Sequence, residues 1–318
     1  MTNLISQHLS PTGETASAKK MPKIWAVGSG KGGVGKSFVS ANLGLAIARQ
    51  GKRVVMVDLD LGGANLHTCL GIGQPDKTLS DFFTADNRDI NALITPVCDN
   101  IGVISGAADG LQIANIKHFQ KIKILRNLRK IAADYIILDL GAGTTFNTLD
   151  FFVHADRGIL SVIPEPTSIE NTYRFLKCVC IRKLKTVDTG TQHIIQNVLT
   201  QKRKEGRKIK TLAALLSTMA QLHPEHSTQL AQTMSKMNMH LIVNQVIESS
   251  DIEMGHSFKV ACKNYFGMDV DYLGYLHHDT SVLKALRLRK PFISQFPQSR
   301  LAINLDHMAA TLMTRDAC

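Results

Sequence analysis

The chain has 318 residues, of which 44% are hydrophobic and 20% are charged, a composition that supplies a substantial core and argues against global disorder. No stretch approaches the roughly 18 apolar residues of a transmembrane helix, and the first residues lack the basic and apolar regions of a signal peptide. The six cysteines form no C-x-x-C pair, which is typical of free thiols in a reducing compartment. We therefore expect a cytoplasmic protein with either one large domain or about two smaller ones.

The net charge of +11 is concentrated in one segment. Residues 174–210 contain eleven Lys and Arg residues against two acidic residues, which gives this segment a net charge of +9. A local basic excess indicates something about partners and little about the fold.

Residues 1–22 are rich in small and polar residues and predict a flexible N-terminal tail. From residue 23 onward, short apolar runs alternate with helical stretches. The predicted strands are 23–27, 53–59, 101–104, 135–138, 158–163, 241–246 and 272–276. Most of these runs are continuously apolar, as in strands that are covered on both faces. Strands separated by helices indicate right-handed crossovers, so we expect a doubly wound, mostly parallel α/β sheet within a single domain, 23–318.

Three helical regions stand out between and after these strands. In 115–133, an apolar stripe predicts a core-facing surface, and lysines including Lys121 fall on the opposite, solvated face; the stripe comprises Ile116, Phe119, Ile122, Leu125 and Leu128. More than seventy residues separate the strands near 163 and 241, and they predict a helical excursion over about 168–238 with helices at 168–185, 191–204, 211–222 and 225–237. The last helix, about 299–313, has an apolar stripe but few basic residues, which favours packing on the domain over insertion into a membrane surface.

The strongest motif is a phosphate-binding loop that satisfies G-x-x-x-x-G-K-[ST] between a predicted strand and a predicted helix. It consists of Gly30, Lys31, Gly32, Gly33, Val34, Gly35, Lys36 and Ser37, and Phe38 follows it. Glycines allow successive backbone N–H groups to point at phosphate oxygens, and the helix N-terminus adds partial positive charge. We expect Lys36 to contact the β- and γ-phosphates of ATP and the Ser37 hydroxyl to coordinate Mg²⁺.

The additional lysine, Lys31, makes the loop resemble the K-G-G-x-G-K-S signature of the MinD/ParA ATPases. The resemblance implies that Lys31 reaches across an ATP-bound homodimer to the partner's phosphates. Asp58 and Asp60, in Val-Asp-Leu-Asp-Leu-Gly-Gly, are similar to the family's switch I region. By resemblance, Asp60 orients the attacking water and Asp58 lies near Mg²⁺, although a lone aspartate at a strand end can also cap a helix.

Further segments extend the resemblance over about residues 23–300. Tyr-Ile-Ile-Leu-Asp-Leu-Gly-Ala-Gly, 135–143, resembles Walker B and switch II, which implies that Asp139 serves the Mg²⁺ site and that Gly141 senses the γ-phosphate. Glu165, in Pro-Glu-Pro-Thr-Ser-Ile, matches a position that contacts the partner's ribose. Asn244 matches an asparagine that reads adenine, and a carboxamide can donate and accept at once, as the adenine edge requires.

The overall pattern is most similar to the flagellar number and placement regulators of the FlhG/FleN group. The D-Q-A-x-x-L-R motif of that group is missing from residues 1–22. The resemblance implies an ATP-dependent dimerising switch that positions or counts a cellular structure with a protein partner, at a pole or peripherally on the membrane. The alternatives are ParA-like partitioning of DNA or protein cargo, and a metabolic ligase, a kinase or an iron–sulfur carrier on the same fold.

The basic segment 174–210 allows four interpretations: a solvated face, nonspecific DNA binding, anionic lipid headgroups, or an acidic protein partner. We expect no iron–sulfur cluster, because Cys178 and Cys180 lie two residues apart on a predicted helix and face different directions.

Overall fold

A computed structural model describes residues 21–60, 63–84, 89–106, 116–206 and 208–317. The predicted tail, 1–22, lies outside the described residues apart from its last two. The strands are β1 (Lys23–Gly28), β2 (Val54–Leu59), β3 (Thr95–Cys98), β4 (Ile101–Ile104), β5 (Tyr135–Leu140), β6 (Arg157–Val162), β7 (Met239–Val246) and β8 (Val270–His277). The helices are α1 (Lys36–Arg49), α2 (Leu66–Cys69), α3 (Asp81–Thr84), η1 (Ile90–Leu93), α4 (His118–Leu128), α5 (Phe146–His154), α6 (Pro166–Leu184), α7 (Thr189–Lys204), α8 (Leu212–Leu222), α9 (Pro224–Ser235), α10 (Ser249–Phe266), α11 (Ser281–Arg287), α12 (Phe292–Gln295) and α13 (Arg300–Ala317).

The strands form one eight-stranded sheet in the order β3-β4-β2-β5-β1-β6-β7-β8. Every pairing is parallel except that of β3 with β4. This confirms the doubly wound, mostly parallel sheet and all seven predicted strands. The strand β3 was not predicted. It is an edge strand whose residues alternate between exposed and half-buried and include Pro96, which cannot donate to a ladder.

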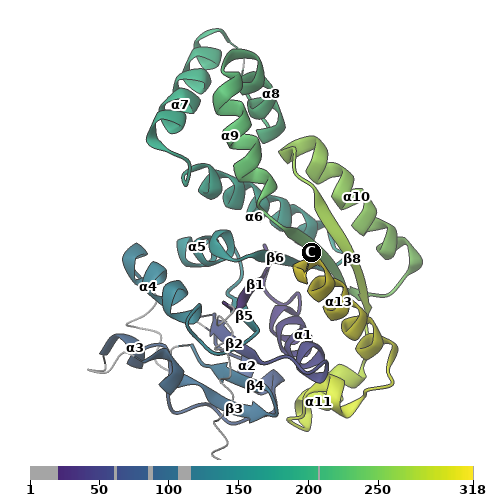
Figure 1. The fold of residues 1–318 in the computed structure, drawn as a ribbon. Coiled ribbons are helices and arrows are strands. Elements are labelled where there is room, and N and C mark those ends of the chain that lie inside the picture. Colours follow the sequence, from purple (N-terminus) through teal and green to yellow (C-terminus); the bar gives the residue numbers. More distant parts are fainter. Residues whose placement is uncertain (1–20, 61–62, 85–88, 107–115, 207, 318) are drawn as a thin grey trace, which may run out of the picture.

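Helices cover both faces of the sheet (Figure 1). Alternate residues of the central strand β1 point to the two covered faces. Ile24 and Ala26 belong to a core shared with α4, α5, α6 and α10, whereas Trp25 and Val27 belong to a core shared with α1, α12 and α13. Because both faces are buried, the strands read as continuous apolar runs rather than as alternating ones.

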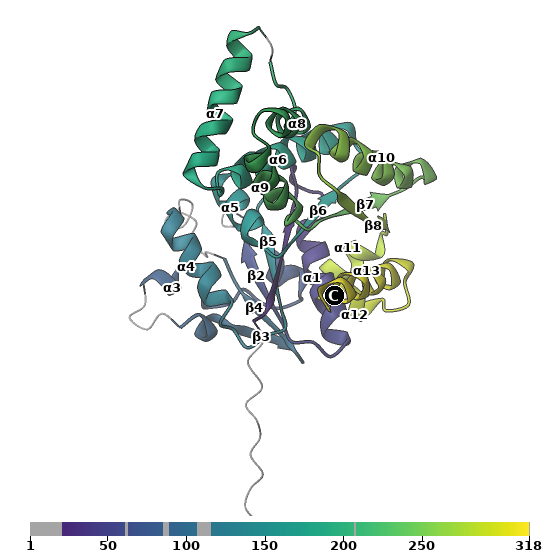
Figure 2. The same ribbon diagram turned by 45° about the horizontal axis from the view of Figure 1, so that its top comes forward.

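The helical excursion is confirmed, with α6, α7, α8 and α9 close to the four predicted helices. A small separate core holds α7, α8 and α9 together, formed by Val187, Ile195, Val198, Leu215, Met219 and Leu230. Figures 1 and 2 show these helices projecting beyond one end of the sheet.

The prediction for 115–133 was partly wrong. The helix α4 is shorter than predicted, Phe119 is exposed, and Lys121 is buried rather than solvated. Lys121 donates to Asp150 of α5 over 2.7 Å, and Arg182 of α6 contacts the same carboxylate. A buried charge requires such a partner. The ion pair, rather than the spacing of apolar residues, therefore determines that Lys121 lies on the buried face of the helix.

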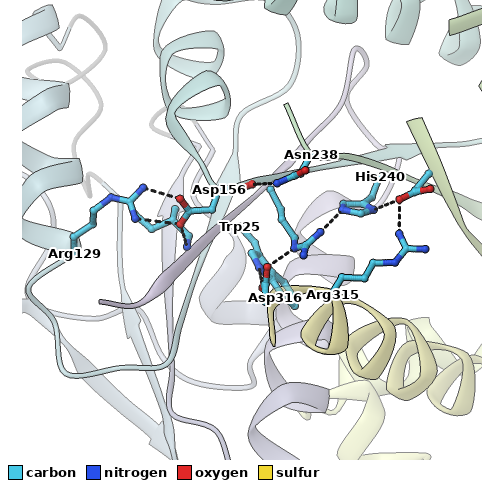
Figure 3. Close-up of polar contacts among 10 residues, drawn as sticks. Trp25, Arg129, Asp156, Asn238, His240, Arg315 and Asp316 are labelled. Carbon is cyan, nitrogen blue, oxygen red and sulfur yellow. Dashed lines mark hydrogen bonds and ion pairs between the residues drawn. The ribbon is translucent and has the colours of Figure 1, made fainter. Parts of the chain in front are cut away.

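The last helix, α13, packs on the domain as predicted, with its apolar stripe fully buried. Figure 3 shows how its end is held: the Asp316 carboxylate accepts hydrogen bonds from Trp25 Nε1 at 2.9 Å and from Arg157 Nε at 2.6 Å. Arg157 also donates to His240 Nε2, 2.9 Å away. The C-terminal helix is therefore tied to β1, β6 and β7. Across the described ranges, no helix combines the length and apolarity needed to cross a membrane.

Candidate functional site

The phosphate-binding loop lies between β1 and α1, where the strand order reverses. The chain moves from β1 outward to β2 and β4, returns to β5, and then builds β6, β7 and β8 on the other side of β1. In doubly wound sheets, the crevice at the carboxyl ends of the strands at such a switch point binds ligands.

Three glycines are required by the shape of the loop. Gly33 and Gly35 have φ angles of 78° and 83°, in the left-handed region. Gly30 lies against α6, because a Cβ added there would be 2.1 Å from the carbonyl oxygen of Asn171. The loop is thus pressed onto the start of α6, and a side chain at this position would separate them.

Side chains of β6 and β7 form hydrogen bonds to carbonyl oxygens of the loop. Ser161 Oγ and Asn244 Nδ2 donate to the carbonyl oxygen of Val34 at 3.1 and 2.9 Å, and Gln245 Nε2 donates to that of Gly33 at 3.4 Å. Because a trans peptide points its C=O and the next N–H in opposite directions, the N–H groups after these carbonyls face away from the sheet. These contacts orient the loop's donors toward the crevice.

Ser161 and Gln245 were missed by the sequence analysis, although a serine inside the apolar run 158–163 was a usable signal. Asn244 is buried, and its Oδ1 accepts from the backbone N–H of Gln245 at 2.9 Å. One of its two N–H groups is committed to the loop, and its contact with adenine stays a prediction. Phe38 packs its ring on Phe292, so only its backbone is available to the site.

Lys36 is almost fully buried in the loop. Burial lowers the pKa of its amine, and the nearby Asp139 and Asp60 carboxylates partly oppose this. Asp139 is fully buried at the end of β5, and burial raises its pKa to about 6, although hydroxyl groups of Ser37 and Ser40 stabilise the anion. Ser40 Oγ donates to Asp139 Oδ1 at 2.8 Å, whereas Oδ2 has no partner among the described residues.

Asp58 lies beside Asp139 in the paired register of β2 and β5. Burial, followed by the charge of Asp139, raises its pKa to about 7. Its two oxygens accept hydrogen bonds from the backbone N–H groups of Asp60 and Leu66, each at 3.0 Å. Asp58 therefore shapes the segment that carries Asp60.

The carboxylates fit a hydrated divalent cation. The two neighbouring carboxyls are buried and have raised pKa values, and one oxygen of Asp139 has no partner among the described residues. A positive ion there would stabilise both charged forms and would give that oxygen a partner. Within the described part of the chain there is no cluster of three or more acidic, His or Cys ligands. Mg²⁺ needs none, since it binds through one or two carboxylates together with phosphates and waters.

Asp60 approaches the segment that follows β5. A Cβ added to Gly141 would be 3.2 Å from Asp60 Oδ1, and the backbone N–H of Gly143 donates to the carbonyl oxygen of Ser29 at 3.0 Å. The loops after β2 and β5 therefore meet at the start of the phosphate-binding loop. Residues 61–62 of this region lie outside the described residues.

The second lysine of the loop has the opposite environment. Lys31 Nζ donates to Glu165 Oε2 at 2.8 Å and to Thr167 Oγ1 at 3.1 Å. The side chains of Lys31 and Glu165 are 36% and 52% exposed. The sequence predicts separate roles for Lys31 and Glu165, and the structure brings the two side chains together at the exposed edge of the site. Thr167, which was not predicted, contacts the same lysine.

Comparisons with known proteins agree with this geometry. Residues 25–292 match the model of the CobQ/CobB/MinD/ParA nucleotide binding domain. The antiactivator FleN of Pseudomonas aeruginosa is 26% identical over 285 residues, covering 88% of this chain and 82% of FleN. The septum site-determining protein MinD of Helicobacter pylori is 27% identical over 265 residues, covering 80% and 94%.

The structure resembles that of the Pyrococcus furiosus cell division ATPase MinD with a TM-score of 0.61 and 21% identity, over 92% of this chain and 99% of the other. The likeness supports the fold. Together with the family match across most of the sequence, the switch-point loop and its paired carboxylates lead to one conclusion: this chain belongs to the CobQ/CobB/MinD/ParA nucleotide-binding family.

Proposed function

We propose that the protein is a Mg²⁺-dependent ATPase, converting ATP and water to ADP and phosphate, and that its ATP-bound homodimer is the active state of a molecular switch. Residues 23–318 act as one ATPase domain in this proposal. The observation that carries it is the pair of loop lysines, of which Lys36 is buried and Lys31 is partly exposed. One lysine suffices to hold phosphates within a chain, so the second is available to another subunit.

Each residue then has a defined task. The N–H groups of the loop and Lys36 hold the β- and γ-phosphates, while Ser37, Asp139 and Asp58 provide the environment for Mg²⁺. When bound, Mg²⁺ neutralises phosphate charge. Asp60 orients and polarises the attacking water, a role that contributes about 10²–10⁴-fold in other enzymes. Gly141 follows the γ-phosphate through its backbone N–H.

Closure of the dimer replaces a contact inside each chain. The partner's Lys31 leaves Glu165 and contacts the phosphates, and Glu165 becomes free to contact the ribose across the interface. Hydrolysis removes the γ-phosphate that holds the closed state, so the dimer separates. A phosphate-dependent bias between two conformations is what a switch requires.

As to pathway, we propose a role of the FlhG/FleN type, in the placement or number of flagella, carried out in the cytoplasm and at a pole or membrane surface. The similarity to FleN over most of both chains supports this choice. The alternative is partitioning of DNA or protein cargo, which is favoured by the basic excess of residues 174–210.

A mixing experiment tests the trans arrangement. Lys31→Ala and Asp60→Ala proteins should each bind ATP and release little phosphate. In a mixed dimer, the Lys31→Ala subunit keeps its own Asp60 and receives the partner's Lys31, so one site is complete. Phosphate release by the mixture above the sum of the separate proteins supports the proposal. No gain from mixing, with ATP bound by both proteins, would contradict it, because Lys31 acting within its own chain leaves both sites defective.

A further inference from the structure

A large groove lies in the helical excursion, apart from the phosphate-binding loop. It has a volume of about 1210 Å³ and is bounded by α6, α7, α8 and α10. Its floor is mainly apolar and includes Ile181, Leu184, Ile195, Leu199, Leu212 and Phe266. A cavity of this size exceeds the roughly 300–1,000 Å³ of ordinary small-molecule sites. We call this surface the excursion groove.

Some apolar residues of the excursion groove are exposed, and most of the basic residues around it form no ion pair among the described residues. Ile181 is 47% exposed and Tyr265 is 58% exposed, and both line the same groove, where contiguous exposed apolar surface marks an interaction site in a way that scattered apolar residues do not. Basic residues from α6, from its C-terminal end and from the α7–α8 connection surround the floor: Arg174, Lys177, Lys185 and Lys210. Arg174 pairs with Glu170 at 2.7 Å, whereas no ion pair within the described ranges involves the three lysines. The groove thus combines an apolar floor with uncompensated positive charge.

The shape of the excursion groove selects among partners for such a surface. A bilayer is nearly flat, so it would meet the rim of a concave groove and the exposed Ile181 but not the more deeply buried residues of the floor, such as Phe266. Duplex DNA would contact the basic rim but not the apolar floor, because nonspecific DNA binding relies on phosphate contacts. An amphipathic helix inserts an apolar stripe into a groove between helices, and its flanking side chains meet the rim.

We propose that the excursion groove binds an amphipathic helix of a partner protein, with an apolar stripe against the floor and acidic residues facing Lys177, Lys185 and Lys210. This goes beyond the ATPase cycle and does not depend on it. The helix α6 nevertheless connects the two sites: it begins at Pro166, beside Glu165, and Asn171 lies against Gly30 of the loop. Its later turns line the groove.

Binding can be measured with the full-length protein and defined probes. The probes are synthetic amphipathic helices of about 18 residues that carry leucine or phenylalanine at i, i+3, i+4 and i+7 and glutamate on the flanks. Peptides with lysine in place of glutamate, scrambled acidic peptides, phosphatidylglycerol vesicles and duplex DNA complete the set. Fluorescence anisotropy and vesicle co-sedimentation give the affinities, and the ATPase rate of each variant reports on the separate nucleotide site.

Matched variants locate the binding surface. Lys177→Glu with Lys210→Glu should weaken binding of the acidic peptides by about 10-fold or more, whereas Arg203→Glu with Lys204→Glu, exposed residues outside the groove, should change it little. Ile181→Ser should also weaken binding by about 10-fold, whereas Leu222→Ser, equally exposed at 47% but outside the groove, should not.

Saturable binding of the acidic helices that depends on groove residues, with weaker binding of the lysine and scrambled peptides, supports the inference. Three results would overturn it: no saturable binding of any acidic helix, equal loss in groove and control variants, or vesicles or DNA binding through groove residues in place of the peptides. Since all substituted residues lie outside the nucleotide site, a normal ATPase rate in the variants shows that the fold is retained.

Discussion

Lys31 and Glu165 form an ion pair within one chain, with 2.8 Å between Nζ and Oε2. The lysine that resemblance assigns to the partner's nucleotide is therefore paired within its own chain in this structure. A partly exposed pair of this kind contributes only about 0–1 kcal/mol, so its exchange for a phosphate contact costs little. In the proposed switch, Lys31 stays paired at the edge of its own site until the partner subunit binds.

The first prediction concerns the Lys31→Ala variant. We expect the free energy of unfolding to change by no more than about 1 kcal/mol, since a partly exposed pair is lost. Binding of ADP to the monomer should be unchanged, because Lys36 and the loop remain, while phosphate release should fall sharply. Urea unfolding, ADP titration and a phosphate assay measure the three quantities. Loss of ADP binding in this variant would show that Lys31 serves its own chain's nucleotide.

The second prediction compares two glycines of the loop. Gly30→Ala should destabilise the apo protein by about 1–3 kcal/mol, because the added Cβ would lie 2.1 Å from the backbone oxygen of Asn171. Gly32→Ala should stay within about 0.5 kcal/mol, since no atom lies within 4 Å of its added Cβ. Urea unfolding without nucleotide measures both. Equal stability of the two variants would contradict the close packing of the loop on α6.

The third prediction concerns the buried ion pair between α4 and α5. Lys121→Met should destabilise the protein by about 3 kcal/mol, because removing one member of a buried pair leaves the carboxylate of Asp150 with less compensation. Lys130→Met is the control, since Lys130 is an exposed lysine just beyond the same helix. Thermal or urea unfolding compares them. A Lys121→Met protein as stable as the control would show that Lys121 is solvated, as the sequence alone indicated.

The fourth prediction concerns pH and His240, which is buried in the network that holds α13 (Figure 3). Burial lowers its pKa from 6.5 to about 4, with a further contribution from Arg157. The folded state therefore binds fewer protons than the unfolded state between these values. Its contribution to stability is present above pH 6.5 and is lost as the pH falls toward 4.

Because Asp58 and Asp139 have raised pKa values and act in the opposite direction, the test is a difference between proteins. The wild type should lose about 2 kcal/mol relative to His240→Gln between pH 7 and pH 5. The glutamine oxygen can still accept the bond from Arg157. Parallel pH profiles of the two proteins in urea unfolding would rule out this role for His240.

Much of the fold was predictable because its signals are local. Continuous apolar runs specified seven strands, and the length between 163 and 241 specified the excursion. The edge strand β3 was missed because a short run with Pro96 has no such signal. Lys121 was placed on the wrong face because its burial depends on Asp150 and Arg182, which belong to later helices and are brought close only by the fold.

In the site, too, features with a local signal in the sequence were predictable, whereas contacts between distant segments were not. The loop was recognisable because phosphate binding constrains consecutive residues. Asp58 and Asp139 were recognisable because each ends an apolar strand within a segment that resembles a motif of the family. Ser161 and Gln245 were missed because their task is to hold carbonyl oxygens of the loop from other strands. The pairing of Lys31 with Glu165 likewise spans more than a hundred residues of sequence, so only the tertiary structure reveals it.

The most direct test of the switch is the solution mass of the Asp60→Ala protein, measured by multi-angle light scattering with Mg-ATP and then with Mg-ADP. If Asp60 orients the attacking water as proposed, its loss should preserve bound ATP, so we expect a dimer with Mg-ATP and a monomer with Mg-ADP. Adding Lys31→Ala should return the Mg-ATP sample to a monomer. A monomer in both nucleotides, with ATP binding verified by titration, would contradict the ATP-dependent dimer.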